Sequence, residues 1–301
     1  MNKPFAALCA LFLGLSFAPA TELTAAEATR PQAAPQRHSL WSLKGKSNTV
    51  HLLGSVHFLS ETEQLPKALD DAYRGADVLL MEIDMDDLDP MEAQRITLEL
   101  GMLPTGDSLE QQLGPQAWSM MVARAQELGI APDILNRFQP WLAAMTLVQL
   151  QLMKMGLAPT AGVEQRFTAR AVADKKPIHG LETVREQLSM LAGLPSKQQR
   201  EFLLYSIEDA ERMTQEVDAL LSAWRRGDSE ALAQLLAEGL EQYPDLYRPL
   251  TTERNRRWLG QVEALLDDRE DYLVVVGTLH LVGKDSLIEL LEAKGHRVVQ
   301  H

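Results

Sequence analysis

The sequence predicts an α/β fold with a mixed central sheet built from two related strand-Gly-x-x-His halves, flanked by helices and carrying a large helical insertion. Three observations support this prediction. Short apolar runs typical of buried strands occur near the start, the middle and the end of the chain. The stretches between them carry apolar residues three and four apart, as in amphipathic helices. Finally, a strand pattern runs twice into Gly-x-x-His, as "GSVH" at 54–57 and "GTLH" at 277–280.

The N-terminal residues differ in composition from the rest of the chain. Lys3 precedes the apolar run "FAALCALFLGLSFA", and a small-x-small pattern follows at 18–20, so residues 1–20 are predicted to be a secretory signal peptide. The alternative is an uncleaved membrane anchor, although the run is short for a spanning helix. Residues 21–37 are rich in Ala, Pro, Thr and Glu and are predicted to be a disordered linker. We therefore expect a periplasmic or secreted protein with one domain over 38–301.

Charge and cysteine content exclude several classes of site. The formal net charge of -13 argues against a nucleic-acid surface, which needs clustered Lys and Arg. Cys9 is the only cysteine and lies in the predicted signal peptide, so the mature chain would lack disulfides, zinc–thiolate sites and cysteine nucleophiles. No run of about eighteen apolar residues follows residue 30, so we expect no membrane span in the mature chain.

The predicted elements follow in order along the chain. Apolar runs and turn residues predict strands over 40–43, 49–53, 78–81, 176–180, 272–276 and 297–300, the first two forming a hairpin around "KGKSN". Helical spacing, interrupted by Pro and Gly, predicts helices over 64–74, 89–100, 116–128, 140–155, 162–173, 183–193, 197–224, 229–240, 252–266 and 284–294.

Polar side chains follow four of the predicted strands. His57 and His280 follow two of them, and Glu82 and Glu182 follow two others. Because ligands in α/β proteins bind at the carboxyl ends of the strands, we expect these four side chains to converge. Each Gly is expected to allow a sharp turn, with backbone angles that a Cβ disfavours, which aims the histidine back over the sheet edge. The alternative remains that either histidine is a satisfied core residue, since short motifs are weak signals.

Both carboxylates also have structural alternatives. Glu82 follows four apolar residues, and burial there is costly unless the carboxylate is paired, hydrogen-bonded or metal-bound. Its alternative is an exposed acid at a strand end. Glu182 precedes Thr183, a predicted helix N-cap with Glu186 at the capping-box position, so its alternative role is to flank that cap.

Two helices add further candidates. Glu164 shares a helix face with Phe167, which places its carboxylate beside apolar side chains. Arg254 and Asn255 precede Trp258 by four and three residues and extend its apolar stripe. A buried Arg–Asn pair needs polar partners, for which the strand-end carboxylates are suited. The alternative for this pair is a solvated first helical turn.

Six segments resemble one family in their order and separation: "LLGSVHFLS", "AYRGADVLLMEID", "GVEQRF", "KKPIHGLET", "RNRRW" and "YLVVVGTLHLVGKDSLIELLEAKGHRVVQ". Together, over roughly His38 to the C-terminus, they resemble the TraB/GumN/Tiki family. The resemblance implies a fold related to the erythromycin-esterase and haem-binding ChaN group, and Tiki members are described as metal-dependent proteases. It implies as functional residues His57, Glu82 and His280, with Glu164, Glu182, Arg254 and Asn255 as further candidates. The chain is expected to differ from animal Tiki proteins in its short loop after His57 and in lacking a membrane anchor.

Two function classes follow. The first is a metal-dependent hydrolase of peptide or ester bonds, acting on a peptide or small molecule, with His57 and His280 as ligands and Glu82 as ligand or general base. Two imidazoles and a carboxylate suit Mn, Co or Zn and leave a position for an activated water. A remaining Glu is the candidate base and Arg254 the candidate oxyanion stabiliser. The alternative is a non-catalytic protein that binds haem, a metal or a peptide signal, and a third hypothesis is a structural protein of the periplasm.

Overall fold

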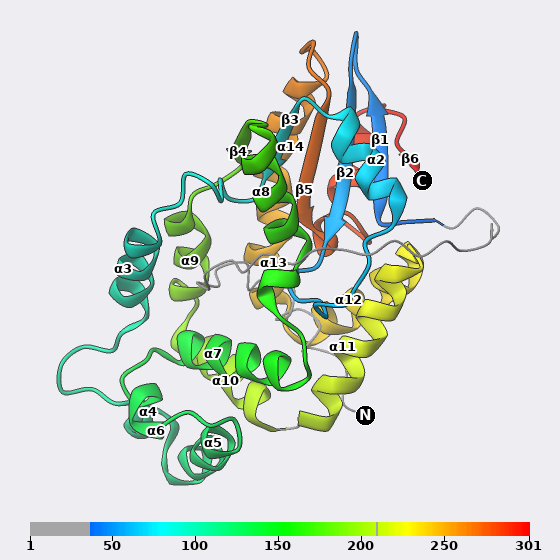
Figure 1. The fold of residues 1–301 in the computed structure, drawn as a ribbon. Coiled ribbons are helices and arrows are strands. Elements are labelled where there is room, and N and C mark those ends of the chain that lie inside the picture. Colours follow the sequence, from blue (N-terminus) through cyan, green and yellow to red (C-terminus); the bar gives the residue numbers. More distant parts are fainter. Residues whose placement is uncertain (1–36, 209) are drawn as a thin grey trace.

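The computed structural model describes residues 37–208 and 210–301 (Figure 1). The predicted signal peptide, and the predicted linker up to residue 36, lie outside the described residues. In the described part, six strands form one mixed sheet in the order β4-β3-β5-β2-β1-β6. The strands are β1 (Leu40–Lys44), β2 (Thr49–Ser55), β3 (Val78–Met81), β4 (Ile178–Gly180), β5 (Tyr272–Gly277) and β6 (Val299–Gln300). The predicted α/β class and all six predicted strands are confirmed.

Four neighbouring strands run parallel. β3 pairs with β4 and β5, and β5 pairs with β2, whereas β1 lies antiparallel to both β2 and β6. The β2–β5 register sets Gly54 opposite Val276 and Ser55 opposite Gly277, so the two Gly-x-x-His segments leave adjacent strands one residue out of step. Since the carboxyl ends of parallel strands share one edge of a sheet, the segments that follow β2, β3, β4 and β5 meet there.

The helices lie in two long and two short connections between the strands. α2 (Lys67–Gly75) lies between β2 and β3, and η2 (Thr278–His280) and α15 (Leu287–Ala293) lie between β5 and β6. Between β3 and β4 lie α3 (Pro90–Gly101), α4 (Leu109–Leu113), α5 (Pro115–Glu127), α6 (Pro132–Leu135), α7 (Pro140–Lys154), η1 (Pro159–Ala161) and α8 (Val163–Asp174). Between β4 and β5 lie α9 (Val184–Ala192), α10 (Ser196–Glu208), α11 (Ala210–Arg225), α12 (Ser229–Gln242), α13 (Pro244–Leu250) and α14 (Thr252–Leu265).

Three short helices were not predicted. α4, α6 and α13 have five, four and seven residues, which is too short for a periodic apolar stripe to form. The helix predicted over 197–224 corresponds to two helices, α10 and α11, which run in different directions in Figure 1. The other predicted helices are present, with ends shifted by up to three residues.

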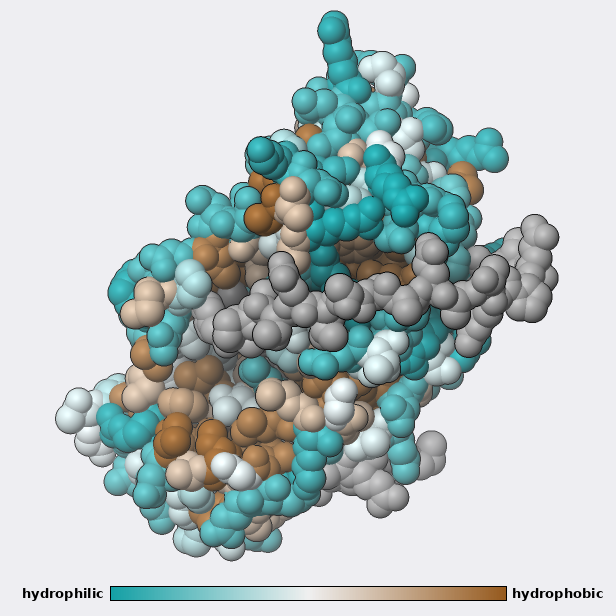
Figure 2. Space-filling model, viewed as in Figure 1, coloured by the Kyte–Doolittle hydropathy of each residue, from teal (hydrophilic) through white to brown (hydrophobic). Residues whose placement is uncertain are grey.

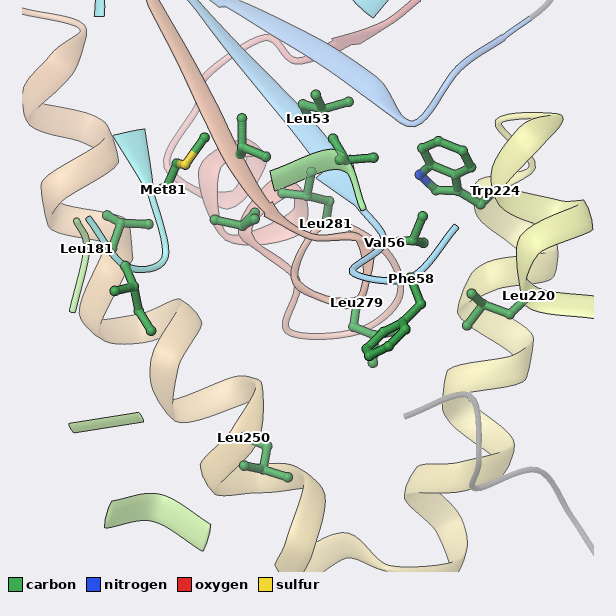
Figure 3. Close-up of a cluster of buried hydrophobic side chains, with 14 of the residues drawn as sticks. Leu53, Val56, Phe58, Met81, Leu181, Leu220, Trp224, Leu250, Leu279 and Leu281 are labelled. Atoms are coloured by element: carbon green, nitrogen blue, oxygen red, sulfur yellow. The ribbon is translucent and has the colours of Figure 1, made fainter. Parts of the chain in front are cut away.

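A buried apolar layer surrounds the carboxyl edge of the parallel strands. Each of the four strand-end residues has buried apolar neighbours in the chain, and Figure 3 shows six of them, namely Val56, Phe58, Met81, Leu181, Leu279 and Leu281. Trp224 of α11 lies beside β2, where its indole Nε1 donates a hydrogen bond to the carbonyl of Gly54 at 2.7 Å. The charged groups at the edge therefore lie in surroundings of low dielectric constant.

The exposed apolar side chains gather on another part of the molecule. Apart from Val299, the large exposed apolar residues of the described chain lie on helices between β3 and β4: Met91, Leu98, Met120, Ile134, Met153 and Val172. Figure 2 shows apolar side chains concentrated over the helical part below the sheet, whereas the end formed by the sheet is mostly hydrophilic. Within the described residues, every helix is too short or too polar to cross a bilayer.

Candidate functional site

Arg254 lies at the centre of the polar site. It belongs to the first turn of α14, and its side chain is completely buried. The guanidinium has five N–H groups, and each has an acceptor. Nη2 donates to Glu82 Oε2 at 2.5 Å and to Glu182 Oε1 at 2.6 Å, and Nε donates to Glu182 Oε2 at 3.2 Å. Nη1 donates to the carbonyl of Leu250 at 3.2 Å and to Nε2 of His280 at 3.0 Å. The predicted buried stripe of α14 is confirmed.

Glu82 lies at the end of β3 and is buried. Its Oε1 accepts a hydrogen bond from the backbone N–H of Gly277 at 2.7 Å, in addition to the contact of Oε2 with Arg254. Burial alone would raise the pKa of Glu82, but the charge of Arg254, the nearby His280 and His57, and the Gly277 N–H together lower its pKa to about 2. Glu82 is therefore ionised at neutral pH and is not an exposed strand-end acid.

Glu182 has both of its predicted environments. Thr183 caps α9 in a capping box, in which its hydroxyl accepts from the N–H of Glu186 and Glu186 accepts from the N–H of Thr183. The side chain of Glu182 turns away from this cap to Arg254 and is 4% exposed. Burial raises the pKa of Glu182, while Arg254 opposes that rise. The two carboxylates that share Arg254 thus have pKa values displaced in opposite directions.

His280 is held as a neutral imidazole with a defined tautomer. The amide nitrogen of Asn255 donates to the carbonyl of Asp285 at 2.8 Å, which directs Asn255 Oδ1 toward His280 Nδ1, 2.6 Å away. Nδ1 must then carry the proton, and Nε2 accepts from Arg254. Burial and the charge of Arg254 lower the pKa of His280 to about 3. Trp258 packs against the ring, with ring centroids 4.6 Å apart.

His57 has a different partner. Its Nδ1 lies 2.9 Å from Oε1 of Glu164, which α8 presents from its first turn, and the hydroxyl of Ser55 donates to the same carboxylate oxygen. Burial lowers the pKa of His57, but the nearby carboxylates of Glu164 and Glu82 together outweigh it, so the net pKa is raised. The predicted placement of Glu164 beside apolar residues is confirmed, since it is buried together with Phe167. The structure thus places all seven predicted site residues in two adjoining clusters at one edge of the sheet.

The comparisons with known proteins show the family to which the chain belongs. The model of the TraB/PrgY/gumN family matches residues 39–300. The chain belongs to this family. It is 28% identical over 245 residues to the "Uncharacterized protein YbaP" of Escherichia coli (strain K12), covering 80% of this chain and 87% of that protein, and the Shigella flexneri protein of the same name matches equally. No solved structure matches the chain.

The prediction that Gly54 and Gly277 adopt backbone angles disfavoured by a Cβ is wrong. Gly277 has φ −49° and ψ 136°, which other residues adopt readily, and Gly54 is not among the positive-φ glycines of the described chain. Gly54 is instead required by close approach, because a Cβ there would lie 2.6 Å from Thr278 Oγ1 and 3.1 Å from Thr278 Cα. The tight packing of β2 against the segment after β5, rather than backbone freedom, explains this glycine.

The predicted metal ligands have suitable donor atoms but an unsuitable arrangement. Among residues 37–208 and 210–301, no three His, Cys, Asp or Glu side chains are grouped so that they could hold a metal ion. Oε2 of Glu82 and Nε2 of His280 both face the guanidinium of Arg254, at 2.5 and 3.0 Å. As folded, these residues therefore do not fit the predicted ion.

Sequence reasoning missed two contributors to the site. Gln187 of α9 donates through Nε2 to Glu82 Oε2 at 3.1 Å and to Glu182 Oε1 at 3.3 Å, and the backbone N–H of Gly277 donates to Glu82. Gln187 could have been found, because it follows Val184 by three residues on the buried face of α9. The N–H of Gly277 could not, because it depends on the register of β3 against β5.

Proposed function

We propose that this member of the TraB/PrgY/gumN family is a hydrolase of peptide or ester bonds, with its reaction at the carboxyl edge of the parallel strands. One observation carries the proposal. Two histidines follow adjacent parallel strands, and their charged neighbours differ. His57 lies beside the carboxylate of Glu164, whereas His280 lies beside the guanidinium of Arg254. Titratable groups whose environments displace their pKa values in opposite directions are typical of acid–base catalysis.

His57 is the proposed general base and acid. Its Nδ1 lies 2.9 Å from Oε1 of Glu164, so the Nε2 side of the ring is the side proposed to face a substrate or a water. Glu164 raises the pKa of His57, so the imidazole takes up a proton from an attacking water more readily. The same proton can then pass from His57 to the leaving amine or alcohol. Ser55 holds Glu164 in place through its hydrogen bond, so Glu164 and Ser55 are positioning residues.

Arg254 has a positioning role in this proposal. Because its five N–H groups are all used within the protein, it has no donor left for a substrate oxyanion in this arrangement. Arg254 instead holds Glu82, Glu182 and the neutral form of His280 in fixed positions. Asn255 supports this role by fixing the tautomer of His280.

The experiment is an activity screen with matched histidine variants. Purified protein is incubated with a peptide library read by mass spectrometry and with chromogenic esters, in EDTA and with Mn, Co or Zn. We expect turnover by the wild type and a loss of about 10²- to 10⁴-fold in His57→Gln, the range for removing a general base. His51→Gln is the control, because His51 lies within β2, four residues before its end. No turnover under any condition, or equal turnover in His57→Gln, would exclude the proposal.

A non-catalytic binding protein for haem, a metal or a peptide signal is the second candidate. The observation that favours it is burial: all seven predicted site residues have side chains that are at most a tenth exposed, and they are largely paired with one another. Haem addition followed by absorption spectroscopy separates the candidates. A Soret shift that is lost in His57→Gln, together with no hydrolysis of any library substrate, would favour binding.

We also propose that the protein is exported. The support is the pattern in residues 1–20, with a basic residue, an apolar run and a small-x-small site. N-terminal sequencing of the protein recovered from an export-competent host tests this proposal. A mature N-terminus near residue 21 is expected, and an intact Met1 in the soluble fraction would contradict it.

A further inference from the structure

We infer that Arg254 is a built-in cation that fills the position a divalent metal would take among Glu82, Glu182 and His280, so that the native site binds no such ion and removal of the guanidinium creates a metal site. The inference rests on the contacts of Arg254 alone. It holds whether or not the protein proves to be a hydrolase.

The acceptors around Arg254 are a set of metal-ligand atoms. Two carboxylates and an imidazole are common ligands of Zn, Mn and Co. Oxygens of Glu82 and Glu182 lie 2.5 and 2.6 Å from the same nitrogen, Nη2, and Nε2 of His280 lies 3.0 Å from the neighbouring nitrogen, Nη1. An ion placed near the guanidinium would therefore reach all three side chains after small shifts, since metal–ligand bonds of about 2.0–2.2 Å are shorter than these hydrogen bonds.

The imidazole is already prepared as a ligand. Asn255 holds the proton of His280 on Nδ1, so the lone pair of Nε2 points at Arg254. A metal-bound histidine has this arrangement, with one nitrogen on the ion and the other donating to a fixed oxygen. These three side chains thus supply atoms of the kind that bind a metal, but the place of the ion among them is taken by a cation of the chain itself.

Arg254 is held too firmly to leave for an incoming ion. Besides its five hydrogen bonds, its guanidinium stacks over the ring of Trp258, with Cζ 4.4 Å from the ring centroid. An ion entering beside it would meet a fixed positive charge in surroundings from which water is excluded, where like charges repel strongly. Withdrawal of Arg254 would in turn take three hydrogen bonds from the buried carboxylates of Glu82 and Glu182, which would keep those from Gln187 and the Gly277 N–H.

Removal of Arg254 is expected to make the site attractive to a metal ion. In Arg254→Ala, Glu82 and Glu182 stay buried beside each other, with the half-exposed Arg257, 3.7 Å from Glu182 Oε2, as a partial counter-charge, so they would gain from a cation with two positive charges. His280 Nε2 loses the donor that Arg254 supplies at the same place. We therefore expect Arg254→Ala to bind about one equivalent of Co(II) per chain, with the visible absorption of ligated cobalt. The Tm of this variant should rise when cobalt is added.

The experiment compares cobalt binding by the full chain and its variants after dialysis against EDTA. Equilibrium dialysis, visible spectra and Tm are measured for the wild type, His280→Ala, Arg254→Ala and the double variant Arg254→Ala/His280→Ala. Arg124→Ala is the matched control, because Arg124 is also buried and paired, with Glu127 and Gln151, outside the site. Cobalt held at other histidines would persist in the double variant and is thereby identified.

The expected result is a cobalt site in Arg254→Ala that is absent from the wild type, the Arg124→Ala control and the double variant. A wild-type protein that binds cobalt with dependence on His280 would overturn the inference, as would a folded Arg254→Ala that gains no such site. If Arg254→Ala is unfolded without metal, the wild-type comparison with His280→Ala decides. The two proposals are tested separately. Absence of hydrolysis would exclude the proposed function but not the role of Arg254, and cobalt binding by the wild type would exclude the role of Arg254 but not hydrolysis.

Discussion

Replacing Glu82 by Gln tests how much the buried carboxylate stabilises the fold. Arg254, the nearby His280 and His57, and the Gly277 N–H together outweigh burial and lower the pKa of Glu82 from 4.5 to about 2. Each pKa unit corresponds to about 1.36 kcal/mol, so this displacement is worth about 3 kcal/mol. Since the pKa is lower in the folded state, the stabilisation is complete above the unfolded value of 4.5 and is lost as the pH falls toward 2. We expect Glu82→Gln to lower the free energy of unfolding at pH 7 by about 3 kcal/mol.

Urea unfolding followed by circular dichroism, at pH 7 and at pH 3, measures this effect. The difference between wild type and Glu82→Gln should shrink by about half at pH 3, because the wild type loses part of the stabilisation there. Glu99→Gln is the control, since Arg185 and Arg95 also lower the pKa of Glu99 to about 2, but on the surface, where water and salt screen the interaction. Equal losses in the two variants, or a Glu82→Gln loss that is the same at both pH values, would refute the reasoning.

Three further predictions follow from the same contacts. Glu164→Gln removes the charge that raises the pKa of His57, so that pKa should fall in an NMR titration of the imidazole, and an unchanged value would contradict the ion pair. His280 has its pKa lowered from 6.5 to about 3, so only the unfolded chain takes up a proton between these values and stability falls as the pH drops. His280→Gln should therefore flatten the dependence of Tm on pH between 7 and about 4, and an unaltered slope would count against a neutral His280. Gly162→Ala places a Cβ 2.2 Å from the carbonyl of His57 and should cost about 1–3 kcal/mol in urea unfolding, whereas Gly260→Ala in open space on α14 should gain up to about 1 kcal/mol. Similar stabilities for these two variants would contradict the proposed packing.

Local patterns predicted the position of most site residues. His57, Glu82, Glu182 and His280 were placed at one edge because buried strands are recognisable as apolar runs and parallel strands share a carboxyl edge. The burial of Arg254 and Asn255 followed from helical spacing to Trp258. These inferences need only neighbours in sequence and one general rule of topology.

Partner identity could not be predicted in the same way. The position of Arg254 between Glu82 and Glu182 depends on where α14 packs. In the chain, Arg254 lies 172 positions from Glu82 and 72 positions from Glu182. The role of Gly54 depends on its approach to Thr278 across the β2–β5 register, which the motif itself does not encode. The residue types of the site were read from the sequence, whereas the position of the Arg254 guanidinium among Glu82, Glu182 and His280 was not.

The structure also separates two histidines that the duplicated motif makes equivalent. Both ring nitrogens of His280 are engaged, Nδ1 with Asn255 and Nε2 with Arg254, so His280 can exchange a proton with a substrate only after one of these contacts breaks. His57 contacts Glu164 through Nδ1 only, and that contact raises its pKa. If the edge of the sheet is catalytic, the proton-transfer chemistry therefore belongs to His57, and His280 serves to hold Arg254 between the carboxylates. The expectation is asymmetric: His57→Gln should lower turnover by about 10²- to 10⁴-fold, whereas His280→Gln should change the pH dependence of stability first.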